Sequence, residues 1–311
     1  GSEGFVGEPS ERKGGVCMGT TLYKNADWII TMNEKREKIR HGDLLISGKE
    51  ILDVGTDLEK KYEGTLKIDH VVEAEGTVIL PGFVNVHHHT WQSLIRNIQA
   101  TRGLKLEPWL TVMYEIYKDL NTDVARAGVY SGLGDMLKTG CTTSNDLWYP
   151  HPVGVKYLVD AEIEAAAEIG IRFHPTRGFH SVPSSIVPPE VVDTKESVVE
   201  DTIRLVKKYH DRSRFSMCQV GIAPSIAQYE TEDIIEAVVD LAEEYDIMVH
   251  GHLAESQHEV EYTLKTWGCR PFEWFKRHRL LGKRFYFAHC IHLNEEEIAQ
   301  MAETGTGVAH C

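Results

Sequence analysis

The sequence contains no apolar run long enough to span a membrane and no cysteine pair of the C-x-x-C type. Its six cysteines are scattered over 311 residues, which is typical of reduced thiols in a cytoplasmic protein and not of a disulfide framework. No signal-peptide core follows the polar start of the chain. We therefore expect a cytoplasmic protein without a membrane partner. Residues 1–20 are interpreted as a tail that begins with the remnant of a removed tag, Gly1 and Ser2.

Basic residues are also scarce. Lys and Arg number 33 against 47 Asp and Glu, which gives a formal net charge of -14. An acidic surface of this size repels phosphate backbones and argues against a nucleic-acid partner. We therefore expect a small substrate that is neutral or cationic. The length, with 42% hydrophobic residues, suits one large α/β domain or two unequal domains.

Short alternating segments fill residues 21–77 and predict an antiparallel β-sheet. The strands expected in this antiparallel sheet are Asp27–Met32, Asp43–Ser47 and Glu50–Val54, and a fourth strand is expected over Val71–Ala74. Ser47, Gly48 and Lys49 supply the turn of a hairpin between the second and third of these strands. This part of the chain is predicted to be a small domain of its own.

A different pattern begins at residue 78. The almost unbroken apolar run Val78–Val86 predicts a strand in the middle of a parallel sheet or barrel. Further strands are expected to end near Asp146, Thr176, Ala223, His252, His289 and His310. Helices are expected over residues 155–169, 196–209, 231–245, 260–267, 271–278 and 294–304. Strands and helices that alternate in this way predict an α/β fold, a (β/α)8 barrel of which residues 78–311 contain seven of the eight strands.

Histidines gather at the carboxyl ends of these strands, where α/β barrels carry their functional residues. His87 and His89 face the same side of an extended segment, and His88 faces away. His252 and His289 end two distant strands, and Glu255 follows His252 closely. One of 16 histidines at a strand end is more often an ordinary hydrogen-bonded side chain than a ligand. Four of them with a glutamate predict a site for Zn²⁺ or a related ion.

These residues carry a family resemblance. The segments are Leu80–His89 (LPGFVNVHHH), His250–Glu255 (HGHLAE), Ala288–Leu293 (AHCIHL) and Gly305–Cys311 (GTGVAHC). They resemble, in order, the first, fifth, sixth and seventh barrel strands of the deaminase branch of the amidohydrolase superfamily. Within that branch the chain looks most like 8-oxoguanine deaminase, isoxanthopterin deaminase and hydroxytriazine aminohydrolases. The resemblance implies a TIM-type barrel flanked by a small β-sandwich, of which residues 21–77 would be the N-terminal part.

The resemblance also implies roles for individual residues. His87, His89 and His252 would bind one divalent metal ion, with zinc as the expected ion and iron as the alternative. Of the two histidines in HGH, His252 matches the family's H-x-x-E spacing to Glu255. Glu255 would be the proton shuttle, and His289 would orient the attacking hydroxide. His292 is the alternative to His289.

The family's remaining ligand is an aspartate at the end of the eighth strand. Asp146 and Asp246 stand at the wrong strands to replace it. Three explanations remain, ranked in this order: the sequence is part of a longer polypeptide, a second chain supplies the strand and its aspartate, or the site lacks the aspartate and binds metal poorly. The resemblance further implies assembly into homo-oligomers.

For the substrate, Gln92 and Trp109 after the first strand and Arg177 after the third are the expected contacts. The alternative is that Trp109 only packs in the core and that Arg177 is a solvated charge. The predicted function is hydrolytic removal of an exocyclic amino group from a purine-, pterin- or triazine-like heterocycle. A chlorohydrolase or amide hydrolase on the same site, and a catalytically incomplete fragment or subunit, are the alternatives.

Overall fold

The computed structural model describes residues 19–311, which form two compact units divided between Pro81 and Gly82. The described part of the first unit, residues 19–81, is a β-sheet with one short helix. The second unit, Gly82–Cys311, is an α/β structure. Of the expected tail, residues 1–20, only Gly19 and Thr20 are among the described residues. Cys17 lies outside them.

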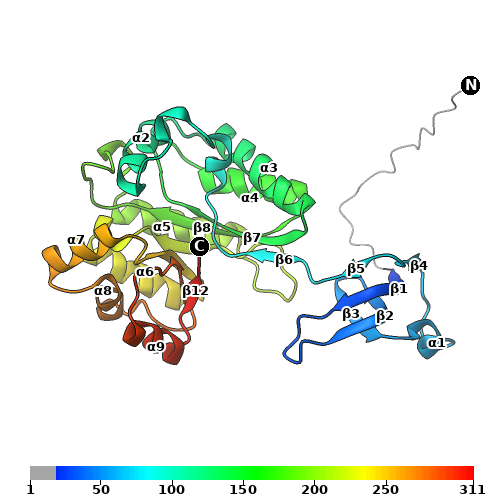
Figure 1. The fold of residues 1–311 in the computed structure, drawn as a ribbon. Coiled ribbons are helices and arrows are strands. Elements are labelled where there is room, and N and C mark those ends of the chain that lie inside the picture. The colour runs from blue at the N-terminus through cyan, green and yellow to red at the C-terminus, as the bar shows by residue number, and fades with distance from the viewer. Residues whose placement is uncertain (1–18) are drawn as a thin grey trace, which may run out of the picture. The chain divides into compact units, whose positions relative to one another are not determined.

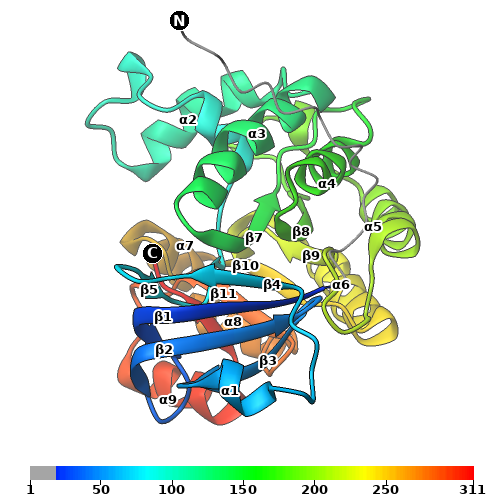
Figure 2. The ribbon, with the colours of Figure 1, turned by 90° about the vertical axis from the view of Figure 1, so that its right-hand side faces the viewer.

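The first unit is a single mixed sheet of five strands (Figure 2). Its elements are β1 Thr20–Ile30, β2 Lys38–Ser47, β3 Glu50–Gly55, α1 Leu58–Tyr62, β4 His70–Glu73 and β5 Val78–Ile79. The antiparallel pairing predicted for the first three strands is confirmed. The fourth strand, β4, for which the sequence predicted no direction of pairing, pairs with β1 in parallel. After β3 the chain passes through α1 before it returns to the sheet, and such a crossover can bring a strand in parallel.

The apolar run at 78–86 does not form one barrel strand. Its first part is β5, which pairs with β1 in the first unit. Its second part is β6 Phe83–Asn85, an edge strand of the second unit on which Phe83 and Val84 are 59% and 61% exposed. The prediction of one strand over the whole run was therefore wrong, whereas its place in the parallel sheet is confirmed for Phe83–Asn85, which pairs with β7. Pro81 has no backbone N–H to donate to a sheet, so it separates the two strands.

Seven parallel strands form the sheet of the second unit, as the sequence predicted (Figure 1). They are β6, β7 Cys141–Trp148, β8 Arg172–Phe179, β9 Gly221–Pro224, β10 Val249–Leu253, β11 Phe285–His289 and β12 Gly307–Ala309. Each strand pairs in parallel with its neighbours in sequence, in the order β12-β11-β10-β9-β8-β7-β6. The result is an open half-barrel whose strands end on one common edge.

Helices connect the strands and pack around the sheet (Figure 1). The α-helices are α2 Leu106–Tyr117, α3 Thr122–Lys138, α4 Leu158–Ile169, α5 Lys195–Tyr209, α6 Glu232–Tyr245, α7 Gln257–Trp267, α8 Pro271–Arg277 and α9 Glu295–Thr304. Four 3-10 turns are η1 Thr90–Leu94, η2 Gln99–Thr101, η3 Pro189–Val191 and η4 Ala227–Tyr229. The expected helices from α4 onward are present, whereas α2 and α3 were not predicted. Three glycines within α3 lower its helix propensity and obscure its pattern.

The structure contains no helix in residues 19–311 with the length and apolar character needed to cross a membrane. The five cysteines in the same residues are free. The main apolar core of the second unit lies between the sheet and its helices and includes Trp148, Phe179 and Phe287.

Gly251 stands where β9 and β10 come unusually close. A β-carbon at this position would lie 2.5 Å from the carbonyl oxygen of Pro224. We expect Gly251→Ala to lower the free energy of unfolding by about 1–3 kcal/mol, because one strand must shift to admit the methyl group. Urea unfolding followed by tryptophan fluorescence measures this change.

Gly134 in α3 is the matched control, because a β-carbon there would have nothing within 4 Å. Gly134→Ala should leave the free energy of unfolding unchanged or raise it by up to about 1 kcal/mol, since alanine favours the helix. Equal effects of the two substitutions would contradict the close approach of the two strands.

Candidate metal centre

Three histidines from two strand ends point their ring nitrogens at one another. His87 and His89 follow β6, and His252 lies within β10. Each offers one nitrogen, and the three nitrogens all lie within 4.8 Å of one another. The Nε2 atoms of His89 and His252 are 3.3 Å apart. The structure therefore brings together the three residues that the sequence singled out as metal ligands.

The tautomers of two of these rings follow from their hydrogen bonds. Nδ1 of His89 lies 2.7 Å from the carbonyl oxygen of Leu147, and Nδ1 of His252 lies 2.6 Å from that of Ser225. A carbonyl oxygen only accepts, so in both rings Nδ1 carries the hydrogen. Burial lowers the pKa of His252 to about 3 and that of His89 well below its usual value, so both rings are neutral at pH 7. Both Nε2 atoms are then unprotonated.

These geometries fit a divalent cation. Two unprotonated nitrogens 3.3 Å apart present facing lone pairs, which repel unless a cation lies between them. Nitrogens bound at 2.0–2.1 Å to a tetrahedral zinc ion are about 3.3 Å apart. The donor set, neutral imidazole, is also one that zinc and iron accept. The cluster could therefore hold a metal ion.

His88 faces away from the other two, as its position in the sequence predicted. Its ring lies toward α3, where a β-carbon on Gly132 would be 3.3 Å from Cε1 of His88. Burial lowers the pKa of His88 to about 4. His88 is not among the residues that line the cavity beside the three histidines.

Glu255 and His289 lie beside the histidine cluster. Nε2 of His289 is 3.4 Å from Oε1 of Glu255, and the His289 ring stacks on that of His252 with centroids 5.2 Å apart. Burial, with a smaller effect from the charge of Glu107, raises the pKa of Glu255 to about 7. Burial also lowers the pKa of His289 to about 4. At neutral pH His289 is uncharged, and Glu255 can both take and give a proton.

The backbone at these positions is unusual. His289 ends β11 with φ 72°, and Ala254, just before Glu255, has φ 50°. Left-handed conformations cost energy for residues other than glycine and often occur where a side chain must be aimed. The alternative residue, His292, does not line the cavity, and its carbonyl oxygen accepts a hydrogen bond from Arg270.

A cavity of about 360 Å³ opens over the cluster. It is lined by His87, His89, Gln92, Leu106, Glu107, Trp109, Leu110, Tyr114, Tyr149, His180, Ser225, Ile226, Gln228, Tyr229, His252, Glu255, Ser256 and His289. Gln92 and Trp109 are thus placed where substrate contacts were expected. Most of the other walls are aromatic or apolar, which suits a small planar molecule.

His180 is a lining residue that the sequence reasoning missed. Its Nε2 lies 2.5 Å from the hydroxyl oxygen of Tyr114, and its Nδ1 is 3.6 Å from Oε1 of the buried Glu230. His180 follows directly after β8. The rule that functional residues stand at strand ends would have found it, had β8 not been expected to end three residues earlier, near Thr176.

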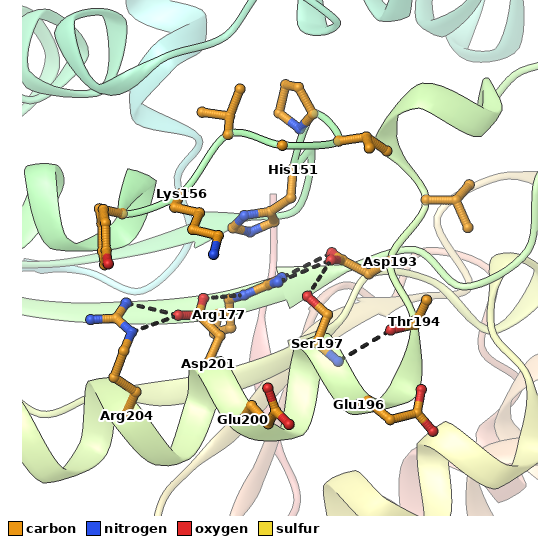
Figure 3. A pocket seen from close by; sticks show the side chains of 16 residues that line it. His151, Lys156, Arg177, Asp193, Thr194, Glu196, Ser197, Glu200, Asp201 and Arg204 are labelled. Atoms are coloured by element: carbon orange, nitrogen blue, oxygen red, sulfur yellow. Dashed lines mark hydrogen bonds and ion pairs between the residues drawn. The ribbon is translucent and has the colours of Figure 1, made fainter.

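Arg177 occupies a different place from the one expected. It lies inside β8, and its guanidinium donates to Asp201 at 2.8 Å and to both carboxylate oxygens of Asp193 at 3.1 Å (Figure 3). These groups line a second cavity, of about 580 Å³, between residues 151–157 and 192–204. The expectation that Arg177 contacts substrate beside the histidines is corrected. Because β8 extends to Phe179, Arg177 points sideways from the strand and not out of its end.

A buried acidic pair holds the segment that follows His89. Oδ1 of Asp146 accepts the N–H of Thr90 at 2.5 Å, and the Thr90 hydroxyl donates to Oε1 of Glu162. All three side chains are fully buried. Burial raises the pKa of Asp146 to about 7 and that of Glu162 well above its usual value. Asp146 therefore bonds the backbone of Thr90. The other aspartate considered above, Asp246, is exposed and forms an ion pair with Arg284.

The profile of the Amidohydrolase family matches residues 78–311. The chain belongs to the amidohydrolase family. This confirms the resemblance that the strand-end motifs carried. An 8-oxoguanine deaminase from Pseudomonas aeruginosa is 33% identical over 242 residues, which cover 77% of this chain and 54% of that protein. A hydroxydechloroatrazine ethylaminohydrolase from a Pseudomonas species is 29% identical over 304 residues, 94% of this chain and 63% of that protein.

Solved structures of this family share the fold. An atrazine chlorohydrolase from Arthrobacter aurescens, crystallised with zinc, superposes with a TM-score of 0.84 at 26% identity, over 93% of this chain and 65% of that one. The chain therefore spans between about half and two thirds of the length of the relatives it matches.

The acidic pair predicts how the free energy of unfolding depends on pH. A carboxyl group whose pKa is raised on folding binds more protons in the folded state, so stability is lost as the pH rises from the unfolded pKa toward the folded one. Glu162→Gln keeps the shape and removes one of the two acids. We expect the variant to be more stable than wild type at pH 8, by about 1–3 kcal/mol, and to differ little at pH 5.

Glu164→Gln, a substitution of a partly exposed glutamate on the same helix, is the control and should show no such pH-dependent gain. Urea unfolding at pH 5 and pH 8 measures the free energies of unfolding of wild type and of both variants. If the free energy of unfolding of Glu162→Gln, relative to wild type, is lower at pH 8 than at pH 5, burial does not raise the pKa values of the two acids.

Proposed function

We propose that this chain carries the metal-dependent catalytic site of a hydrolase that removes an amino group from a planar nitrogen heterocycle. The observation that carries the proposal is the cluster of three histidine nitrogens beside Glu255 and His289, at the base of a largely aromatic cavity. Relatives about 30% identical are named deaminases or aminohydrolases of such rings.

In this proposal His87, His89 and His252 hold one divalent ion, zinc in the first place and iron as the alternative. The choice of zinc is supported by the nitrogen donor set and by a structural relative crystallised with zinc. When bound, such an ion supplies Lewis acidity that makes water a nucleophile at neutral pH. Family resemblance adds an aspartate as a further ligand, together with assembly into homo-oligomers.

Glu255 moves the protons. Its pKa near 7 lets the carboxyl group carry one proton of the attacking water to a ring nitrogen and then carry the second proton to the departing amine. The neutral His289 orients Glu255 through the contact between Nε2 and Oε1 and stands ready to hydrogen-bond the attacking oxygen. Water and the amino-substituted ring give the oxo-substituted ring and ammonia.

The cavity sets the substrate class. Trp109, Tyr149 and Tyr229 offer faces and edges on which a flat ring can stack. The side-chain amide of Gln92 donates to the Tyr117 hydroxyl at 3.0 Å, and this bond orients its oxygen. A volume of about 360 Å³ suits one or two fused rings, such as an aminotriazine, an oxopurine or a pterin.

A second candidate is hydrolytic dechlorination on the same site. It is favoured by the structural match to an atrazine chlorohydrolase. The two reactions share the attacking water and differ in the leaving group, so they are distinguished by whether ammonia or chloride is released.

The proposal is tested by Glu255→Gln in the zinc-loaded chain, with ammonia release measured over a panel of amino-substituted purines, pterins and triazines. We expect the rate on the best substrate to fall by about 10²–10⁴-fold, because the amide cannot shuttle a proton. Zinc affinity should change little. Glu261→Gln, on the exposed side of α7, is the control and should keep the wild-type rate.

Ammonia release by Glu255→Gln at the wild-type rate would remove Glu255 from the reaction. Release of chloride from chlorinated rings, with none of ammonia from the panel, would favour the second candidate.

A further inference from the structure

His250 contacts His87, one of the proposed metal ligands, on the side of the His87 ring that carries Nδ1. It is on β10, two residues before His252, and its side chain is fully buried outside the cavity. Its Nε2 lies 2.8 Å from Nδ1 of His87. His89 and His252 each bond a backbone carbonyl through Nδ1, whereas His87 bonds another imidazole.

We propose that His250 is a positioning residue, which fixes the tautomer and the orientation of His87 so that His87 Nε2 is free to bind a metal ion. This inference rests on the metal site of the proposed function. It deepens that proposal by assigning a role to a residue that touches neither the ion nor the substrate.

When both imidazole rings are neutral, the chain of hydrogen bonds has only one consistent direction. Nδ1 of His250 lies 2.9 Å from the backbone oxygen of Tyr286, which can only accept, so this nitrogen carries the hydrogen. The Nε2 of a neutral His250 is then an acceptor. His87 must donate to it through Nδ1, and this leaves His87 Nε2 without a hydrogen.

Tyr286 also fixes the plane of the His250 ring. The two rings are stacked, with centroids 4.1 Å apart and planes 11° from parallel. His250 and Tyr286 are register partners in the pairing of β10 with β11. One residue of β11 thus supplies both the hydrogen-bond acceptor and the stacking surface, so the sheet register determines how His250 faces His87.

The consequence concerns the affinity for metal. Without an acceptor at Nδ1, the His87 proton can move to Nε2, where it would block the ligand atom, and the ring can rotate. Removal of a hydrogen-bond partner of a metal ligand typically weakens metal binding 10–100-fold.

Two substitutions separate the two functions of the His250 ring. In His250→Gln the side-chain oxygen can reach the place of Nε2 and accept from His87. In His250→Asn the shorter amide can replace only Nδ1 and bond Tyr286. His250→Phe keeps the ring and removes both bonds. His174→Gln is the matched control, because His174 is also a histidine of the sheet, with its ring 6.1 Å from that of Tyr286, and it bonds the carbonyl of Gln219.

Two readouts are taken on the full chain. Zinc affinity is measured by competition with a chromogenic chelator, and circular dichroism shows that each variant is folded. Long-range proton–nitrogen NMR spectra of the metal-free protein report which nitrogen of each histidine carries the hydrogen.

We expect wild-type His87 to carry its hydrogen on Nδ1. The zinc dissociation constant should rise about 10–100-fold in His250→Phe and His250→Asn and stay within about 3-fold of wild type in His250→Gln and His174→Gln. Where His250→Phe fails to fold, the contrast between the Gln and Asn variants decides.

Wild-type zinc affinity in a folded His250→Phe, or equally weak binding by the Gln and Asn variants, would overturn the role of His250. So would NMR spectra that place the His87 hydrogen on Nε2 in the wild-type chain. Wild-type protein that binds no zinc but carries the His87 hydrogen on Nδ1 would overturn the proposed metal site and not the positioning role of His250. The two proposals can therefore fail separately.

Discussion

The candidate site depends on hydrogen bonds that hold the ring hydrogens of its histidines on the side away from one another. The carbonyls of Leu147 and Ser225 fix Nδ1 of His89 and His252. The resulting Nε2 lone pairs face each other at 3.3 Å. This arrangement is unfavourable without a cation and favourable with one. The proposed reaction, with Glu255 as the proposed proton shuttle, requires a cation bound between these nitrogens.

The parallel sheet brings these histidines together although they are far apart in the sequence. His89 and His252 are separated by 163 residues, yet the strands that carry them end on the same edge. The acceptor for each ring belongs to a neighbouring strand or to the segment that follows one: Leu147 is in β7, and Ser225 follows β9. The buried pair of Asp146 and Glu162 anchors Thr90, directly after His89. The pairing of the strands therefore determines which ring nitrogen of His89 and of His252 carries the hydrogen.

Much of the unit that carries the site could be predicted from the sequence, because strand and helix periodicity and strand-end histidines are local signals. The seven strands and the convergence of His87, His89 and His252 follow from them. The predictions from the sequence were wrong where tertiary contacts determine the bounds of a strand or helix. Pro81 divides an apolar run between two sheets, and glycines hide α3. The end of β8, placed too early, put Arg177 in the site and left out His180. A single sequence carries no signal for the Nδ1 partners, which are backbone atoms of other strands.

The central claim is our proposal that His87, His89 and His252, which could hold a metal ion, bind one divalent ion through their Nε2 atoms, in a chain of the amidohydrolase family. Zinc K-edge X-ray absorption of the chain loaded with one equivalent of zinc tests this claim most directly. The account predicts a first shell of nitrogen or oxygen at about 2.0–2.1 Å with the outer-shell scattering of three imidazole rings. A sulfur shell at about 2.3 Å, or a shell without imidazole scattering, would contradict it.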